Sequence, residues 1–452
     1  MNTKDNIELS TEQQNVVQLA INTQQNILLT GLAGSGKTLT TKKLLEVTPK
    51  KVMVTATTGV AALNLGGVTL HHALGFKPDI TLDTVADAVK NNNRKANIIK
   101  ALDTLVIDES SMLRADLADC VELALRLYRD SQEPWGGVQI ILIGDLYQLP
   151  PVLQARDKAV FYSVYESEYF FSSQAYKTGK FKLIELTTVY RQKDTTFVDN
   201  LNKLRDGNIS DKELLYFNNR VNKSFEPAKD EMYVCLTATN NEASRINDIH
   251  LASIISKPYL SEAVVNGDFP SSYYPTELAL TLKVGAQVMM ITNDKGGRYI
   301  NGSLGVIRNI KRPDAIIQVE LQTGMTIEVT RNTWEIMKLV STGDNRLKNE
   351  VIGSFTQHPM RLAAAITIHK SQGQSIPNLI IDTKNFFASG QLYVALSRAM
   401  SIEGLVLKNK IYRSDIKVDY RITKFMKGLT GNSNSKENIM HSLRSALSSG
   451  RK

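Results

Sequence analysis

Residues 26–45 read NILLTGLAGSGKTLTTKKLL, an apolar strand followed by a glycine-rich turn and the start of a helix. Within this stretch, residues 31–38 fit GxxxxGK followed by Ser or Thr, a pattern typical of a loop that cradles nucleotide phosphates. Glycines let backbone N–H groups approach the phosphates, and the start of the helix adds a partial positive charge. We therefore expect nucleotide to bind through Gly34, Ser35, Gly36 and Lys37, with the Thr38 hydroxyl as a ligand of Mg²⁺.

Two further apolar strands end in polar residues suited to phosphate chemistry. Residues 104–108 lead into Asp108 and Glu109, and residues 138–143 lead into a segment that contains Gln148. Strands that alternate with helices form a parallel sheet, whose carboxyl ends meet at one edge. Beside a phosphate loop, Asp108 is expected to hold Mg²⁺ through water and Glu109 to activate the attacking water. The Gln148 amide is expected to contact the γ-phosphate or that water, and to report nucleotide state to a second domain.

The composition is that of a globular protein with a basic balance of charge. The 452 residues are 42% hydrophobic and carry a formal net charge of +9, enough chain for two to four domains. A positive excess favours a polyanionic partner over an acidic small substrate. Cys120 and Cys235 lie far apart in apolar segments, so we expect reduced core residues and a cytoplasmic protein. Because no apolar run approaches the ~18 residues of a membrane span, no membrane partner is expected.

The order of segments predicts two α/β halves with insertions. A second α/β pattern begins with the strand Phe181–Leu186 and resumes at about residues 363–368. Between about 263 and 339, short strands and glycine-containing turns indicate a small barrel inserted into the second half. Residues 78–100 are polar and basic, which favours a small helical insertion in the first half.

Taken together, the ordered motifs resemble a superfamily 1 DNA helicase of the PIF (petite integration frequency) type, over about residues 9–410. The motifs are LSTEQ, GLAGSGKT, TATTGVAALNLGGVTLHHALG, LVIDESSM, PWGG, GDLYQLPPV, LTTVYRQ, LKVGAQVMM, NGSLG, AAITIHKSQGQS and LYVALSRAM. The resemblance implies ATP-driven 5′-to-3′ movement on single-stranded DNA and unwinding of duplex DNA in genome maintenance. Quadruplexes and RNA–DNA hybrids are further candidate targets. The implied partners are single-stranded DNA and DNA forks, bound by a monomer that would be nucleoid-associated in a bacterium or virus.

The resemblance also implies an α/β fold class, with two RecA-like P-loop domains that contain parallel sheets. A small helical or wedge insertion would lie in the first domain and an SH3-like β-barrel insertion in the second. The implied boundaries are 1–175 for the first domain with its insertion at about 76–100, 176–260 and 360–415 for the second, 261–359 for the barrel, and 416–452 for a C-terminal helix and basic tail.

Residue by residue, the resemblance gives roles to side chains in both halves. Gln13 would read the adenine, although its spacing from Ser10 also fits a capping box that starts a helix over about 10–22. Arg191 and Arg398 would act as arginine fingers of the second domain. A guanidinium that arrives only on closure would stabilise transition-state charge and link hydrolysis to domain motion.

The residues that the resemblance places near the single strand are Thr57, Thr58, His71, His369 and Ser371. Hydroxyl and backbone N–H groups suit phosphate contacts that are independent of base sequence. A packed core position fits His71 and His369 equally well, and the spacing of the two histidines does not predict a metal site.

Two rival functions fit part of the pattern. One is an ATP-switched clamp or scaffold that binds single-stranded DNA without processive unwinding. The other is a P-loop phosphotransferase that acts on a small acceptor. The phosphotransferase explains Lys37 and Asp108 but gives the second α/β half and its arginines no role.

Overall fold

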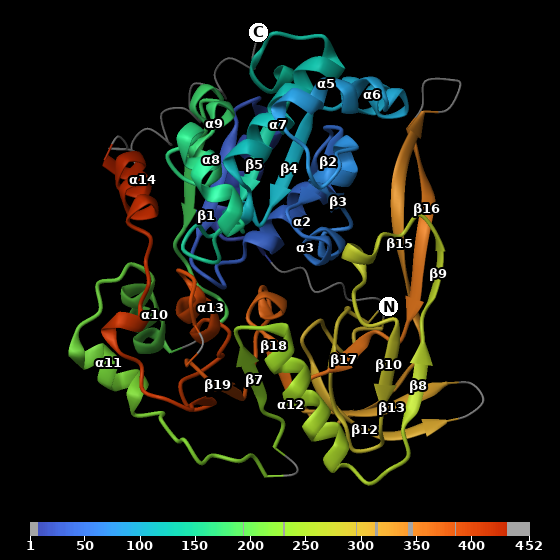
Figure 1. Cartoon of the computed structure of the whole chain (residues 1–452), viewed down its shortest axis with the longest axis vertical. Coiled ribbons are helices and arrows are strands. Elements are labelled where there is room, and N and C mark those ends of the chain that lie inside the picture. Colours follow the sequence, from blue (N-terminus) through green and yellow to red (C-terminus); the bar gives the residue numbers. More distant parts are fainter. Residues whose placement is uncertain are drawn as a thin grey trace.

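The chain contains two α/β domains and an antiparallel β unit (Figure 1). The computed structural model describes residues 8–431 except 193, 229–230, 295, 312–314, 342–346 and 385. We call the part built on β1–β6 the first domain, the part built on β7 and β18–β20 the second domain, and β8–β17 the β unit. The first domain occupies the upper half of Figure 1, and the second domain and the β unit lie side by side below it.

The first domain is built on a six-stranded parallel sheet in the order β3-β2-β4-β5-β1-β6. The apolar strands β1 and β5 are buried along their whole length, as expected of parallel strands covered by helices on both faces. The strands are β1 (Ile27–Gly31), β2 (Val52–Ala56), β3 (Val68–Thr69), β4 (Thr104–Asp108), β5 (Gln139–Ile143) and β6 (Lys182–Leu186). The predicted parallel sheet is confirmed, with the phosphate loop after β1 and Asp108 at the end of β4.

The boundary predicted at residues 175 and 176 is wrong. Strand β6, which the sequence assigns to the second half, pairs in parallel with β1 from Ile27 opposite Lys182 to Gly31 opposite Leu186. The pairing is between segments about 150 residues apart, and an apolar strand pattern does not specify which sheet it joins. The first domain therefore extends through Leu186.

Helices cover both faces of this sheet. The predicted capping box is present, because Ser10 Oγ accepts from Gln13 N at 3.3 Å and Gln13 Oε1 accepts from Ser10 N at 3.0 Å. Two short helices, α5 and α6, lie in the stretch for which the sequence predicts a helical insertion. The helices are α1 (Thr11–Asn22), α2 (Lys37–Val47), α3 (Gly59–Asn64), α4 (Leu70–Leu74), α5 (Leu82–Lys90), α6 (Asn93–Lys100), α7 (Ala115–Arg129), α8 (Lys158–Val164) and α9 (Gln174–Thr178).

The second domain has its own parallel sheet, in the order β18-β7-β19-β20. Its chain is interrupted by the β unit, since β7 precedes that unit and the other three strands follow it. The elements are α10 (Thr195–Arg205), α11 (Asp211–Asn218), β7 (Val234–Thr237), α12 (Asn240–Ser253), β18 (Ala365–Thr367), β19 (Leu379–Ile381), α13 (Gln391–Leu396) and β20 (Leu405–Leu407). The predicted second α/β half is thus confirmed from α10 onward.

The β unit is antiparallel and centres on a five-stranded sheet in the order β14-β13-β12-β11-β17. A long hairpin of β15 and β16 leaves this sheet, runs upward beside the first domain in Figure 1 and contacts α6. The strands are β8 (Tyr259–Glu262), β9 (Val264–Gly267), β10 (Ala279–Leu282), β11 (Gln287–Met290), β12 (Leu304–Lys311), β13 (Ile316–Leu321), β14 (Thr326–Val329), β15 (Asn332–Ser341), β16 (Leu347–Gln357) and β17 (Met360–Leu362).

The last helix, α14 (Tyr420–Gly431), returns from the second domain to the first. Ile422 and Met426 are buried in the core of the first domain, and the Phe425 ring stacks on Phe171 with centroids 4.2 Å apart. The predicted C-terminal helix is therefore confirmed, and it fastens the end of the described chain to the first domain. The predicted basic tail, residues 432–452, lies outside the described residues.

The two cysteines and the lengths of the helices can be compared with the sequence predictions. Cys120 is buried in α7 and Cys235 is half-buried on β7, so the two thiols lie in different domains. Within the described residues, none of the helices combines the length and apolar character needed to cross a membrane.

Candidate nucleotide site and nucleic-acid interface

The phosphate loop has the conformation that its glycines permit. Gly34 and Gly36 both have φ of +83°, in the left-handed region. A Cβ on Gly36 would lie 2.4 Å from Gln13 Nε2, and one on Gly34 would lie 2.5 Å from the Arg191 Cβ. The Ser35 hydroxyl is buried and has no hydrogen-bond partner among the residues that the structure describes. A loop of this shape, with an unsatisfied hydroxyl, fits an anionic ligand.

The Lys37 ammonium lies within this loop. It donates to the carbonyl oxygens of Gly31 and Leu32 at 2.8 and 3.0 Å. Burial lowers the pKa of Lys37, while the carboxylates of Asp145 and Glu109 raise it. The next residue, Thr38, is exposed on the first turn of α2. Lys37 and Thr38 therefore sit where the sequence predicts a phosphate charge and a hydroxyl ligand.

Asp108 and Glu109 form a coupled acidic pair at the end of β4. Burial, and then the neighbouring Glu109 charge, raise the pKa of Asp108 to about 7. Burial also raises the pKa of Glu109, which the charges of Lys37 and Arg398 partly offset. Two such carboxylates are suited to a divalent cation. Mg²⁺ requires oxygen ligands, and its positive charge favours the ionised form of both side chains.

Gln148 is buried at the same edge of the sheet. Its Nε2 donates to the Asp145 carboxylate at 3.3 Å. The amide is therefore held by a fixed neighbour within the first domain.

Arg191 and Arg398 meet at the boundary between the two domains. Arg398 is 1% exposed, and its guanidinium donates to Val394 O and Ser397 Oγ at 3.0 and 2.8 Å. Burial lowers the pKa of Arg398, and the Glu109 carboxylate raises it. Arg191 donates to Ser397 O at 3.2 Å, and burial together with the Arg398 charge lowers the pKa of Arg191 to about 9. Arg398 is therefore buried and electrostatically coupled to Glu109, whereas Arg191 is bound to the segment around Ser397.

The sequence gives Gln13 two roles, a capping box with Ser10 and a contact with adenine. Besides closing the capping box, its Nε2 donates to the Ser35 carbonyl oxygen in the phosphate loop at 3.4 Å. Its structural role is confirmed, and its contact with adenine stays a prediction.

Thr57 and Thr58 are half-buried between β2 and α3. The Thr57 hydroxyl donates to the Glu109 carbonyl oxygen at 3.1 Å, and the Thr58 side chain caps α3 by accepting from Ala61 N at 3.3 Å. Thr57 thus supports the residue expected to be the general base, a role that its position in the sequence does not suggest. Their contacts with DNA stay predictions.

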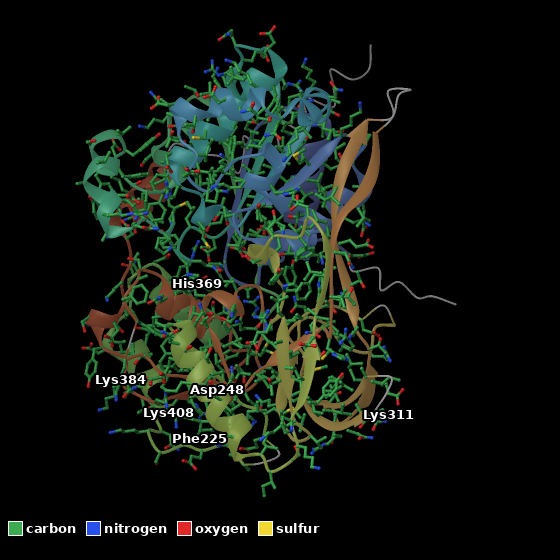
Figure 2. All side chains as sticks on the ribbon, turned by 45° about the vertical axis from the view of Figure 1, so that its right-hand side comes forward. Phe225, Asp248, Lys311, His369, Lys384 and Lys408 are labelled. Atoms are coloured by element: carbon green, nitrogen blue, oxygen red, sulfur yellow. The ribbon has the colours of Figure 1, made fainter. Side chains whose placement is uncertain are left out.

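The other three predicted DNA contacts differ in exposure. His71 is half-buried on α4, whereas His369 is exposed and lies at the end of the second domain that faces the first (Figure 2). Ser371 is buried, and its hydroxyl donates to the Ile368 carbonyl oxygen at 2.8 Å. The predicted contact of Ser371 with DNA stays a prediction.

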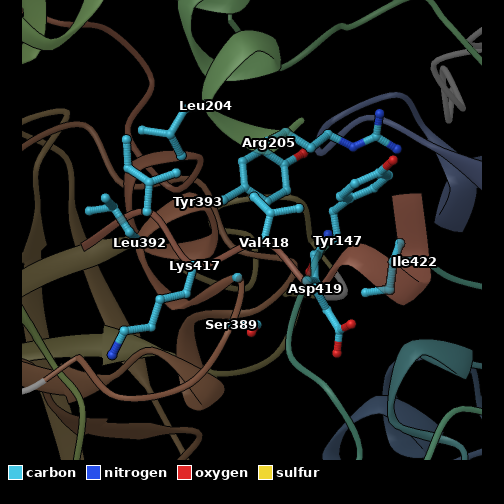
Figure 3. Close-up of a pocket in the computed structure, with 13 residues that line it drawn as sticks. Tyr147, Leu204, Arg205, Ser389, Leu392, Tyr393, Lys417, Val418, Asp419 and Ile422 are labelled. Carbon is cyan, nitrogen blue, oxygen red and sulfur yellow. The ribbon is translucent and has the colours of Figure 1, made fainter. Parts of the chain in front are cut away.

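The sequence interpretation missed three residues at the boundary between the domains: Asp145, Arg205 and Tyr393. Asp145 and Tyr393 lie in the quoted motifs GDLYQLPPV and LYVALSRAM, without a role assigned to either. Arg205 is the last residue of α10 and carries no motif. In Figure 3 Arg205 and Tyr393 line one pocket together with Tyr147, and the Arg205 guanidinium lies over the Tyr147 ring, 4.3 Å from its centroid.

Comparisons with known proteins show the family of the chain. A family model described as PIF1-like helicase matches residues 8–214. The ATP-dependent DNA helicase Pif1 of Bdellovibrio bacteriovorus is 30% identical over 432 residues, which cover 94% of this chain and 93% of that protein. The chain belongs to the PIF1-like helicase family.

Solved structures of the family superpose on this PIF1-like chain to different degrees. Bacteroides sp Pif1 in complex with ADP-AlF4 gives a TM-score of 0.87 at 35% identity, covering 95% of this chain and 98% of that chain. Bacteroides Pif1 in complex with ADP-AlF3 and ssDNA gives 0.68 at 35% identity, covering 95% and 99%. The chain therefore superposes more closely on the ADP-AlF4 complex than on the complex with ssDNA.

Proposed function

We propose that the chain is an ATP-dependent DNA helicase that moves 5′ to 3′ along single-stranded DNA and separates duplex DNA. The observation that carries the proposal is a nucleotide site built from two domains: Lys37 and Glu109 come from the first, and Arg398 from the second. Family membership supports the activity. A phosphotransferase on a small acceptor does not account for the family to which the chain belongs.

The first domain is proposed to bind ATP and Mg²⁺. Lys37 and the loop N–H groups would hold the phosphates, while the Thr38 hydroxyl and, through water, Asp108 would hold Mg²⁺. When bound, ATP supplies the phosphoryl group whose transfer to water drives the cycle. Glu109 would accept the proton of the attacking water at its carboxylate, and Gln13 would contact the adenine.

The second domain is proposed to complete the site. Arg191 and Arg398 would offset the negative charge that develops on the transferred group, and Gln148 would orient the attacking water. Since both arginines are held by the segment around Ser397, a movement of the second domain would move them together.

DNA is proposed to change the arrangement of the parts. The TM-score difference between the two Bacteroides complexes supports this idea, because the lower score belongs to the complex with ssDNA. Thr57, Thr58, His71, His369 and Ser371 are proposed as the candidate contacts. Phosphate-dominated binding predicts that affinity for single-stranded DNA falls steeply with salt, and salt-insensitive binding would contradict this path.

The finer architectural predictions remain proposals. We propose that the domains are RecA-like, that the β unit is an SH3-like barrel, and that the helical insertion α5–α6 contributes to strand separation as a wedge. A single chain is proposed to act on single-stranded DNA and forks in the cytoplasm, without a membrane partner.

Strand displacement on tailed duplexes tests the proposal. With ATP and Mg²⁺, a duplex that carries a 5′ single-stranded tail should be displaced, and one with a 3′ tail should not. ATP hydrolysis stimulated by single-stranded DNA without any displacement would favour the rival clamp. Hydrolysis that does not respond to DNA would favour the phosphotransferase.

A further inference from the structure

Asp145 is a buried carboxylate that contacts both domains. Its side chain is 0% exposed and accepts hydrogen bonds from Tyr147 N at 3.2 Å and Gln148 Nε2 at 3.3 Å, both in the first domain. From the second domain it accepts from Tyr393 OH at 3.0 Å and from Arg205 Nε at 3.4 Å. The carboxylate that holds the Gln148 amide is thus shared with two side chains across the domain boundary.

Tyr393 extends this network to the phosphate loop. Its hydroxyl donates to Asp145 and accepts from the Ala33 backbone N–H at 3.1 Å, so both of its hydrogen-bonding functions are used. A continuous path therefore leads from the loop through Tyr393 and Asp145 to the Gln148 amide. Each link except Tyr393 belongs to the first domain.

Arg205 places a positive charge beside this buried carboxylate. Its side chain is 6% exposed, lies against the Tyr147 ring and faces Asp145 and, at 3.5 Å, Glu185. A buried charge without its partner is strongly unfavourable, so Asp145 and Arg205 are expected to stay together whenever the domains are closed. The backbone is also close here, because a Cβ on Gly390 would lie 2.5 Å from the Tyr147 carbonyl oxygen.

We propose that Arg205 and Tyr393 are positioning residues that set the Gln148 amide and the phosphate loop through Asp145, so that hydrolysis proceeds only when the second domain is docked. The proposal deepens the proposed function and rests on its nucleotide site. Neither side chain needs to touch the reacting atoms. Each acts on the Gln148 amide or the phosphate loop, which are expected to contact the reacting atoms.

The test compares two buried tyrosines that differ in one respect. Tyr393→Phe removes a hydroxyl that crosses the domain boundary, whereas Tyr128→Phe removes one that donates to Leu74 O at 3.1 Å within the first domain. For Tyr393→Phe we expect kcat for ATP hydrolysis with saturating single-stranded DNA to fall about tenfold, the loss of one hydrogen bond to a buried charge. KM for ATP should change less than about threefold, and Tyr128→Phe should leave kcat unchanged.

Arg205 provides the second arm. Arg205→Gln should lower kcat by at least as much as Tyr393→Phe, and Arg205→Lys, which keeps the charge, should restore part of it. Equal kcat in wild type and Tyr393→Phe, or an equal effect of Tyr393→Phe and Tyr128→Phe, would overturn the proposal. The readout is hydrolysis, so a wild-type chain that hydrolyses ATP without unwinding would refute the helicase proposal and leave this comparison valid.

Discussion

The first domain meets the second domain through buried charges, but it meets the β unit through aromatic side chains around Tyr273. We name these the nucleotide seam (Glu109, Asp145, Arg205, Tyr393 and Arg398) and the β-unit seam (Thr69, His72 and Tyr273). In the β-unit seam the Tyr273 hydroxyl accepts from Thr69 N at 2.7 Å and also bonds the Thr69 hydroxyl, while the His72 ring meets the Tyr273 ring edge-on at 6.1 Å.

The two seams differ in what their partial opening would expose. Partial opening of the nucleotide seam would separate Arg205 from Asp145 before water can reach either charge, which is costly and favours movement of the second domain as a unit. Opening the β-unit seam exposes one tyrosine hydroxyl, which can bond to water, and aromatic rings, on which a nucleic acid base can stack. The cost is lower because no buried charge loses its partner. The first seam is suited to couple chemistry to motion, and the second to yield when DNA binds.

The largest effect is expected where the general base is removed while the Arg205–Asp145 pair and the Tyr273–Thr69 contact stay in place. Glu109→Gln should reduce ATP hydrolysis about a thousandfold, because the general base loses its charge, while ATP binding changes less than about threefold. Measured turnover and equilibrium binding of a fluorescent ATP analogue check this. Glu46→Gln, a change at an exposed position on α2, is the control, and undiminished turnover in Glu109→Gln would refute the base assignment.

A smaller effect is expected on stability when the nucleotide seam loses its charge pair. Arg205→Gln should lower the free energy of unfolding by about 3 kcal/mol, because Asp145 stays buried without its cation. The exposed pair Arg245–Glu242 gives the matched control, for which Arg245→Gln should cost about 0.5 kcal/mol. Urea unfolding followed by intrinsic fluorescence measures both, and equal losses would show that burial of the pair has no energetic consequence.

The smallest effect is expected at the β-unit seam. Tyr273→Phe removes the bond to Thr69, so the seam should open about 1 kcal/mol more easily and affinity for single-stranded DNA should rise about fivefold. Fluorescence anisotropy with a labelled oligonucleotide measures the change. Tyr274→Phe is the control, since that ring packs against Phe355 inside the β unit. Weaker DNA binding in Tyr273→Phe would mean that this seam holds the binding-competent arrangement instead.

Local signals in the sequence predicted the first-domain half of the site. The glycine spacing of residues 31–38 and the Ser10–Gln13 capping box depend on neighbours within a few residues, and both have the predicted conformation. Asp108 and Glu109 are predicted because they lie at a strand end beside such a loop. In the structure the charge of Lys37 acts on both carboxylates and lowers the pKa of each, against the effect of burial.

Long-range pairing was the source of the errors and omissions. The strand β6 joins β1 across more than 150 residues, and α14 returns to the first domain from the far end of the chain. The proposed roles of Arg205 and Tyr393 depend on their contacts with Asp145, which lies 60 and 248 residues away in the sequence. A helix-terminal arginine and an apolar-flanked tyrosine have no local pattern that distinguishes them from ordinary packing residues.

The central claim is that the first domain binds the nucleotide and that the second domain completes the site for hydrolysis. Arg398→Ala tests it most directly, by ATP binding and ATP hydrolysis measured on the same preparation with saturating single-stranded DNA. The account predicts ATP affinity within about threefold of wild type and hydrolysis reduced about a thousandfold, as for loss of an arginine finger. Hydrolysis within a few-fold of wild type would contradict it.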